Sequence, residues 1–447
     1  MKRKFLKLAF IGLCLANLNT FAQVNSTLEL DLETALRIAH DNNPTIKIAE
    51  LEIQRVDYSR KEAIGNLLPN LNAGGQYTDN VMKQVMFLSE SFAALMGGQK
   101  YMEVGYKNSF VGSISSQLPL VNFSLWQTIK NKQNDIDMVI EKSRASKIEM
   151  TKQVKDAYYT VLLTKSSLKV LQQSHTNALE TLKNIENSYK QGVVSEYDYI
   201  RAQVNVNNLN PALINAKNGV ELSMMNLIMI LSLPAEQIIE IKEDLENFND
   251  NINIISEIGK RSMIETNSDL KILDYNIIGL KNQLKLINTQ HLPMLSATGS
   301  YIYQTQAEDF KFKDYTWIGS ASVGLQLSVP IFSGMTKVNQ AKQVELSIKS
   351  LEIQREYAKD GINLQVKSAT NTMKAAKEQL VVNKDAIKQA ERGYDIAKVR
   401  YQVGSGTILE LNDSELSLTQ SKLNYQQSLF NFLSAQANLE KVMGSEK

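Results

Sequence analysis

The side chains of this sequence with the clearest chemical potential are carboxylates that follow two glycine-containing turns. They are Glu196 and Asp198 after the first turn, and Glu410 and Asp413 after the second. Carboxylates gathered around a narrow opening favour cations and can bind a divalent ion. Acidic residues are also favoured in the first turn of any helix, because they interact well with the helix dipole. The pattern therefore indicates either a site that attracts cations or ordinary helix starts.

Other reactive side chains are few. The chain has three histidines, His40, His175 and His291, and one cysteine, Cys14. His175 and Ile387 occupy matching positions in two copies of a repeated apolar pattern, which is described in the next paragraph. The apolar residue in the second copy favours a packing role for His175. No glycine-rich phosphate loop, nucleophile elbow or paired-histidine motif occurs in the sequence. We predict that the protein is not an enzyme, and that it has no catalytic, cofactor-binding or metal-binding residue.

The turns belong to a motif that occurs twice, 212 residues apart: residues 189–198 read YKQGVVSEYD and residues 401–410 read YQVGSGTILE. Each copy ends a run of mostly apolar residues spaced seven apart. The two runs are Val154, Val161, Leu168, His175, Leu182 and Tyr189, and Val366, Met373, Leu380, Ile387, Tyr394 and Tyr401. Sustained heptad spacing predicts helices that pack with a left-handed supercoil. Two matched copies predict a duplicated fold.

The first 22 residues have the pattern of a secretory signal. Basic residues precede an apolar run at 8–18, and a Thr-Phe-Ala sequence ending at Ala22 supplies small residues where a signal peptidase cuts. The alternative is a buried N-terminal helix. Because Cys14 lies in this segment, the mature chain has no cysteine for disulfides or thiolate metal sites.

Composition narrows the class of protein further. The formal net charge of +2 gives no indication of nucleic-acid binding. No apolar run long enough for a spanning helix follows the signal. A chain exported in this way is periplasmic, secreted or an outer-membrane β-barrel.

The long helices organise the rest of the chain into two repeats. We predict the repeats at 23–232 and 256–447, joined by a connector at 233–255, with a helical hairpin in each at 122–232 and 334–443. At 1.5 Å per residue, the first helix of each hairpin is about 100 Å long, far beyond a helix of a globular domain.

Before each hairpin, at Leu68-Pro69 and Leu292-Pro293, the apolar period changes from that of a helix to that of a strand. Four strands are predicted, at about 68–78, 109–119, 292–303 and 317–330. One face of each is apolar and the other is rich in Ser, Thr, Gln and Asn, as in strands of outer-membrane barrels. Five aromatic residues near the strand ends are candidates for the membrane interface: Tyr77, Phe110, Tyr301, Tyr303 and Trp317. The alternative is a soluble sandwich with one buried face.

Four strands are too few to close a barrel, because the smallest bacterial barrels have about eight. An open sheet edge in a bilayer leaves amide groups without partners. We therefore expect several copies of the chain to share one barrel. The connecting loops differ in length, 78–109 against 304–316. The longer loop reads as a lid over the barrel mouth or as packing on a neighbour; a methionine-based metal site is the less favoured alternative, since no histidine accompanies the methionines.

Together these features resemble the TolC family of outer-membrane efflux and secretion channels. The resemblance rests on the Leu-x-x-Ala-Leu-x-x-Ala opening that leads from Leu32 to Pro44, on the two Leu-Pro steps, and on the duplicated hairpins. It implies a mainly α fold with a β-barrel portion, in which a trimer builds a 12-strand outer-membrane barrel continued by a periplasmic α-helical barrel.

The resemblance also implies roles for individual residues. The turns Gly192-Val193-Val194-Ser195 and Gly404-Ser405-Gly406-Thr407 would dock an adaptor protein. The periplasmic gate would contain Glu410 and Asp413 as an acidic ring, with Asp198 and Tyr401 bonding across neighbouring helices. Gly406 stands where the family often has a basic residue, which puts an arginine link at that place in doubt.

The predicted function is the exit duct of a tripartite efflux system. It would export small toxic compounds across the outer membrane of a Gram-negative bacterium, together with a periplasmic adaptor (membrane fusion protein) and an inner-membrane pump. Its other contacts would be outer-membrane lipid and its own copies in the homotrimer, with no nucleic acid. The alternatives are a duct for type I polypeptide secretion and, less favoured, a non-conducting coiled-coil tether.

Overall fold

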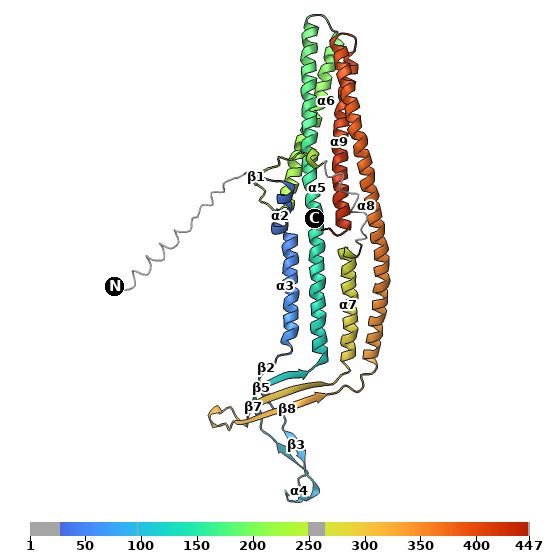
Figure 1. The fold of residues 1–447 in the computed structure, drawn as a ribbon. Coiled ribbons are helices and arrows are strands. Elements are labelled where there is room, and N and C mark those ends of the chain that lie inside the picture. The colour runs from blue at the N-terminus through green and yellow to red at the C-terminus, as the bar shows by residue number, and fades with distance from the viewer. Residues whose placement is uncertain (1–26, 96, 249–263, 446–447) are drawn as a thin grey trace, which may run out of the picture. The chain divides into compact units, whose positions relative to one another are not determined.

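The computed structural model describes residues 27–95, 97–248 and 264–445, so the predicted signal at 1–22 lies outside the described residues. Figure 1 labels the helices and strands of the chain, which divides into two compact units. One unit contains the described residues up to Lys47 together with those of 146–263 and 364–447, and the other contains 48–145 and those of 264–363. Each unit therefore draws segments from both predicted repeats.

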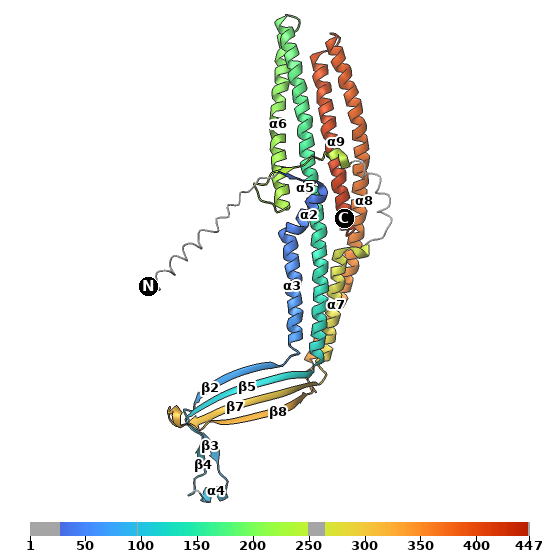
Figure 2. The ribbon, with the colours of Figure 1, turned by 60° about the vertical axis from the view of Figure 1, so that its left-hand side comes forward.

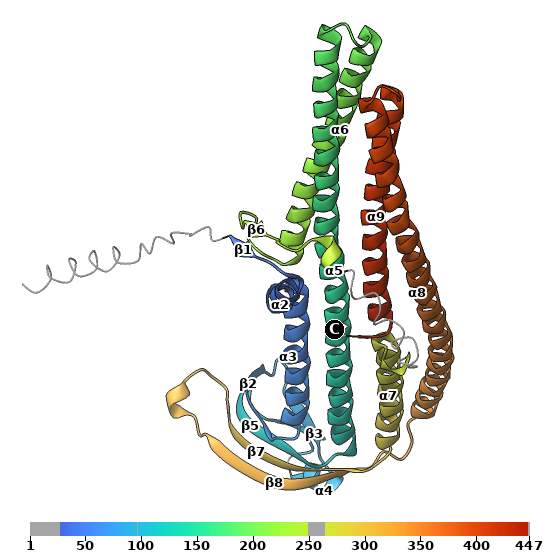
Figure 3. The ribbon, with the colours of Figure 1, turned by 45° about the horizontal axis from the view of Figure 1, so that its top comes forward.

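Two long helical hairpins dominate the chain. The first consists of α5 (Phe123–Lys190) and α6 (Glu196–Ile230), and the second of α8 (Thr336–Gln402) and α9 (Ile408–Val442). In each hairpin the returning helix lies along the longer one (Figure 3). The prediction of a mainly helical chain with two long hairpins is confirmed. No helix within the described ranges combines the length and the apolar character needed to cross a bilayer.

The first unit has its core where the heptad positions of α5 and α8 meet the returning helices. Val154 and Val161 of α5 are fully buried, and Met373 and Leu380 of α8 are nearly so. They share one core with Leu227 of α6 and with Leu429, Phe432 and Leu433 of α9. Burial of such a side chain contributes about 1.5–3 kcal/mol, so the seam is the main source of packing free energy in this unit.

Short elements at the start of the chain fasten onto this core. α2 (Leu32–Asn42) begins at Asp31, whose carboxylate accepts a hydrogen bond of 2.8 Å from the Thr34 amide. β1 (Leu28–Glu29) pairs in parallel with β6 (Ile239–Glu240). The side-chain amide of Asn43 donates to the Ile230 carbonyl at 2.8 Å. The described part of the predicted connector, residues 233–248, is thus joined to β1 through β6.

The second unit contains an antiparallel sheet in the order β2-β5-β7-β8 (Figure 2). The strands are β2 (Asn70–Asp79), β5 (Asn108–Val121), β7 (Met294–Ala307) and β8 (Ile318–Ser328). β7 extends beyond the predicted end at 303, because Thr305 to Ala307 pair with the first residues of β5. Within the described residues, the outer edges of β2 and β8 pair with no strand of this chain.

The helices of the second unit are α3 (Pro44–Gly65), which enters it at Ile48, and α7 (Ser268–Thr289), with the adjoining parts of α5 and α8. Buried contacts join α3 to α5 through Val56 and Ile136, and α7 to α8 through Ile287 and Val344. Arg144 of α5 donates to the Thr266 carbonyl at 3.0 Å.

The predicted interface aromatics cluster in cross-strand pairs on this sheet. Tyr77 of β2 lies directly opposite Phe110 of β5, with ring centroids 5.0 Å apart. Tyr303 of β7 stacks on Trp317 at 5.1 Å, and Trp317 immediately precedes β8. Tyr301, two residues before Tyr303, is about half exposed. Apolar side chains on the edge strand β8, such as Val323 at 92% exposure, are open to their surroundings, as a lipid-facing surface requires.

The longer loop forms a small substructure of its own. β3 (Gln84–Phe87) pairs with β4 (Tyr101–Val104), and α4 (Glu90–Leu95) lies between them. Lys83 joins this loop to Glu308 of the shorter loop by an ion pair of 2.6 Å. The shorter loop also contains the single turn η4 (Phe312–Asp314), whose Phe312 packs against Phe110.

Candidate gating site

The two predicted turns have the same backbone geometry. Gly192 and Gly404 both adopt positive φ, 77° and 73°. In each turn the residue after glycine donates to a carbonyl five residues earlier: Val193 to Ser188, and Ser405 to Arg400, both at 2.9 Å. This is a glycine-terminated helix end of the Schellman type, which non-glycine residues adopt only with strain. Both long helices therefore end two residues before these glycines, at Lys190 and Gln402.

The helices that follow the turns begin with side-chain caps. Ser195 accepts a hydrogen bond from the Asp198 amide at 3.2 Å. Thr407 and Glu410 form a reciprocal capping box, in which Thr407 accepts from the Glu410 amide at 3.2 Å and Glu410 accepts from the Thr407 amide at 3.4 Å. Such caps contribute about 1 kcal/mol each. Asp198 and Glu410 therefore take part in capping the first turns of α6 and α9. The same carboxylates can also face a passage.

Glu410 has a cationic neighbour that the sequence did not indicate. The guanidinium of Arg400, in the last turn of α8, lies 3.5 Å from the Glu410 carboxylate and donates to the Ser405 carbonyl at 3.2 Å. Both side chains are about half exposed, so the pair is weak. The only signal in the sequence was a basic residue four positions before the turn glycine.

Gly406 lies in a tight part of the turn. A β-carbon at this position would lie 3.1 Å from both the Arg400 β-carbon and the Tyr401 amide nitrogen. Contacts this close require the neighbouring atoms to move by a few tenths of an ångström. A side chain at 406 would therefore be crowded, and Arg400 already supplies a positive charge to this turn.

The hairpin ends are joined by a small apolar cluster, which we name the tip cluster: Ile185, Ala202, Ile408 and Leu411. It contains residues of both hairpins. Tyr401 packs against it, and burial raises the pKa of the Tyr401 hydroxyl, with the Asp198 charge as a smaller cause. The structure therefore brings Tyr401 and Asp198 near each other within one chain.

The other predicted gate residues are placed on the surface of the hairpin ends. The Asp198 carboxylate accepts a hydrogen bond from the Ser195 hydroxyl at 2.7 Å. Asp413 is exposed on α9, one turn beyond Glu410. Bonds from Asp198 or Tyr401 to a neighbouring chain stay a prediction. No group of three or more His, Cys, Asp or Glu side chains in the described parts of the chain is placed to hold a metal ion.

The turn side chains are unequal in exposure. Val193 is 73% exposed, whereas Val194 packs against the tip cluster. Beside this turn, Tyr189 of α5 stacks on Tyr199 of α6 with ring centroids 5.3 Å apart. The stacked rings join α5 to α6 beside the first turn. Val193 is the exposed apolar side chain at the end of that turn.

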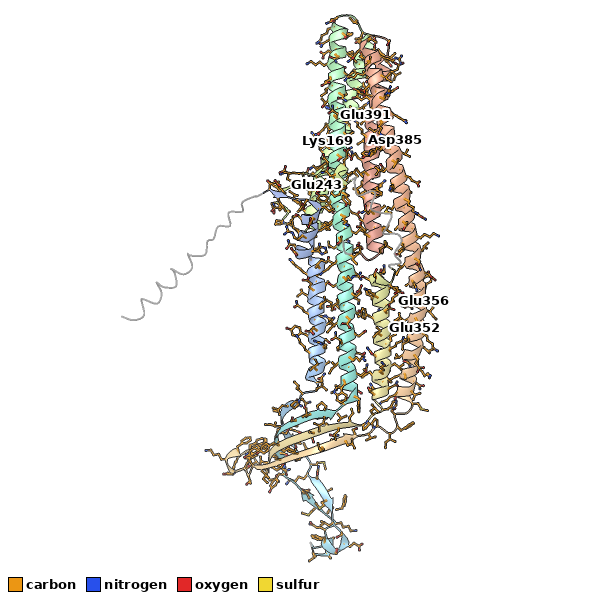
Figure 4. The ribbon with its side chains drawn as sticks, viewed as in Figure 1. Lys169, Glu243, Glu352, Glu356, Asp385 and Glu391 are labelled. Carbon is orange, nitrogen blue, oxygen red and sulfur yellow. The ribbon has the colours of Figure 1, made fainter. Side chains whose placement is uncertain are left out.

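Further along the helices, polar contacts link the two hairpins to each other. Asn205 of α6 lies 3.4 Å from Asn412 of α9, and Thr419 of α9 donates to Ser174 of α5 at 3.0 Å. Within the second hairpin, Glu391 of α8, labelled in Figure 4, pairs with Lys422 of α9 at 3.2 Å.

A buried acid lies in the same region. Glu415 of α9 is 4% exposed, and burial raises its pKa to about 7. The sequence analysis did not single out Glu415. The available signal was its position four residues after Leu411 and three before Leu418, which are buried on the same face of α9.

Comparisons with known proteins extend over nearly the whole chain. A family model described as outer membrane efflux protein matches residues 35–231 and 263–445. The outer membrane protein TolC of Escherichia coli (strain K12) is 22% identical over 457 residues, covering 97% of this chain and 85% of that protein. TolC of Salmonella enteritidis is also 22% identical, covering 100% of this chain and 87% of that protein.

Solved structures show the same fold. The outer membrane protein VceC from Vibrio cholerae superposes with a TM-score of 0.72 at 14% identity, covering 93% of this chain and 96% of that one. The CmeC outer membrane channel of Campylobacter jejuni gives 0.70 at 16% identity, covering 92% and 85%. Since the family model matches most of both repeats, this chain belongs to the outer membrane efflux protein family and is a TolC-like channel protein of the outer membrane.

Proposed function

We propose that three copies of this chain form an outer-membrane duct that exports small toxic compounds, working with a periplasmic adaptor and an inner-membrane pump. The observation that carries the proposal is the four-stranded sheet with two unpaired edges, in a chain that matches the efflux family across both repeats. Three such sheets supply twelve strands, enough to close a barrel in which every edge is paired.

The proposed gate lies at the hairpin ends. Glu410 and Asp413 from three chains would place six carboxylates around the opening, which favours cations over anions. Arg400 offsets part of the Glu410 charge, so Asp413 is the stronger contributor. The turns 192–195 and 404–407 are the proposed docking surface for the adaptor, supported by the exposed Val193 at the first of them.

We also infer that the protein catalyses no reaction itself. The family consists of channel proteins, and a passive duct requires no catalytic group. Transport energy would come from the inner-membrane pump.

Planar-bilayer conductance of the detergent-purified protein tests this function, with a divalent cation titrated on each side. We expect a small, cation-selective conductance that divalent ions block from one side only. An intact trimer without any conductance would indicate a tether instead. A strain that lacks this protein distinguishes the two kinds of cargo. Sensitivity to several unrelated toxic compounds supports efflux. Normal sensitivity together with the loss of a secreted protein indicates polypeptide secretion.

A further inference from the structure

Glu415 is a buried carboxyl group without the partners that such a group requires. It lies on α9 with 4% of its surface exposed, and neither of its carboxyl oxygens accepts or donates a hydrogen bond. An isolated buried carboxylate is costly, and it either finds a partner or takes up a proton. The chain thus keeps an ionisable group at a position where its charge is unfavourable.

The groups around Glu415 come from two neighbouring helices. They are Lys398 and Tyr394 of α8 and Asn177 of α5. Two further acids, Asp395 of α8 and Glu180 of α5, act on Tyr394. The Lys398 charge and the Asn177 amide both favour the carboxylate, but burial outweighs them and raises the pKa of Glu415 to about 7. Asn177 lies near without completing a hydrogen bond. From α6, Asn205 approaches at Asn412, just before Glu415 along α9.

Glu415 lies where the two hairpins contact each other. One turn further along α9, the Thr419 hydroxyl oxygen lies 2.9 Å from the Glu415 carbonyl oxygen and 3.0 Å from the Ser174 hydroxyl of α5, within hydrogen-bond distance of both. On the other side, Asn412 contacts Asn205 of α6 at 3.4 Å. Along α9, Glu415 therefore lies between two polar links that join the hairpins.

We propose that Glu415 is a proton-operated element of the gate: in its neutral form it lets the two hairpins pack together, and in its charged form it favours their separation. This proposal rests on the function proposed above, because it takes separation of the hairpin ends as the step that opens the duct. Separation would let water reach the carboxylate, and the released proton goes to solvent.

The direction of the pH effect follows from the two states. In the packed state the pKa of Glu415 is about 7, whereas an exposed glutamate has the ordinary value of 4.5. Below both values the carboxyl group is neutral in either state and pH has no effect. As pH rises from about 4.5 to 7, the separated state gains relative to the packed one, by at most about 300-fold in the ratio of the two. Acidic conditions therefore favour the closed duct.

Spin labels provide a test that does not depend on conductance. Cysteines replace Gln191 and Gln402, exposed residues at the two hairpin ends, and Cys14, the one cysteine of the sequence, is replaced by Ser if the predicted signal is retained. Pulsed electron paramagnetic resonance then measures the distances between labels in the purified trimer from pH 5 to pH 8. We expect the distances to lengthen as pH rises, with the midpoint of the change between pH 5 and pH 7.

Variants assign the change to Glu415. Glu415→Gln removes the charge and should keep the short distances at every pH. Glu415→Met, of similar volume and also uncharged, serves the same purpose where the glutamine variant does not assemble. Glu221→Gln, an exposed acid of α6, is the matched control and should respond like the parent protein. A parent protein without a pH response, or a Glu415→Gln variant that responds like the parent, would overturn the proposal.

Bilayer conductance over the same pH range separates this proposal from the proposed function. A conductance that rises with pH in the parent protein and stays low in Glu415→Gln supports both. Conductance that is present but equally pH-dependent in the variant overturns the role of Glu415 and leaves the channel standing. If label distances respond to pH through Glu415 while an intact trimer conducts at no pH, the switch is supported and the duct is not.

Discussion

Three acids of α9 lie within two turns and have different surroundings. Glu410 closes a capping box and has Arg400 beside it, Asp413 is exposed, and Glu415 is buried between hairpins. The same residue type therefore serves as a helix cap, a candidate for the passage lining and an ionisable element of the packing. Their charge in the working protein depends on these neighbours more than on their spacing.

The acidic ring is tested by replacing its charges. The double variant Glu410→Gln with Asp413→Asn should lose cation selectivity and bind a blocking divalent ion about tenfold more weakly, because two charges of each chain disappear from the opening. Reversal potentials in a salt gradient and block curves measure both effects. Unchanged selectivity would show that these acids are helix starts only.

The Arg400→Gln variant should change divalent block in the opposite direction. Removing the guanidinium releases the Glu410 charge, so divalent block should strengthen, by a factor of about two to five for an exposed ion pair. The capping box does not involve Arg400, and the start of α9 should therefore keep its helical structure. A weaker block in this variant would contradict the place given to Glu410.

At the scale of elements, the paired turns follow from local chemistry. A helix stops where glycine takes positive φ, and a Ser or Thr three residues later caps the next helix. These requirements involve residues that are close in sequence. The turns at Gly192 and Gly404 could therefore be predicted from the local amino-acid sequence. The same holds for the strands, where alternation of apolar and polar residues marks the pleat.

The turn glycine is tested by a substitution with an internal control. Gly404→Ala meets no neighbouring atom, so its cost is that of positive φ alone, at least about 1 kcal/mol. Gly393→Ala, inside α8 and equally free of contacts, should stabilise its helix by about 0.5–1 kcal/mol. Hydrogen–deuterium exchange of peptides around the second turn should become about fivefold faster in the first variant and slower in the second. Equal exchange in both would show that the turn is not strained by a side chain.

At the scale of the whole molecule, the open sheet edges are the main consequence of this fold. β2 and β8 form the outer strands of the sheet, and their outward amides lack strand partners within the described chain. In a membrane these groups require another strand, and the nearest source is a further copy of this chain.

Cysteine cross-linking tests that pairing. Asn72→Cys on β2 is combined in turn with Ser320→Cys, Ser322→Cys or Gln326→Cys on the polar face of β8. We expect at least one combination to give covalent dimers and trimers on oxidation. The control is Ser300→Cys with Ser322→Cys, which face each other within one chain and should give cross-linked monomer. Monomer from every β2–β8 combination would argue against a shared barrel.

The sequence by itself determined the features that depend on local periodicity: two repeats, long helices that end at glycine turns, strands with one apolar face, and hence the family. Tertiary structure alone decided which charges are balanced and which are buried. Arg400 reaches Glu410 only because the turn folds back on itself, and Glu415 is buried only because α9 packs against α5, more than 200 residues earlier in the chain. Periodicity describes one helix at a time, whereas the protonation of a carboxyl group depends on the residues that other helices place around it.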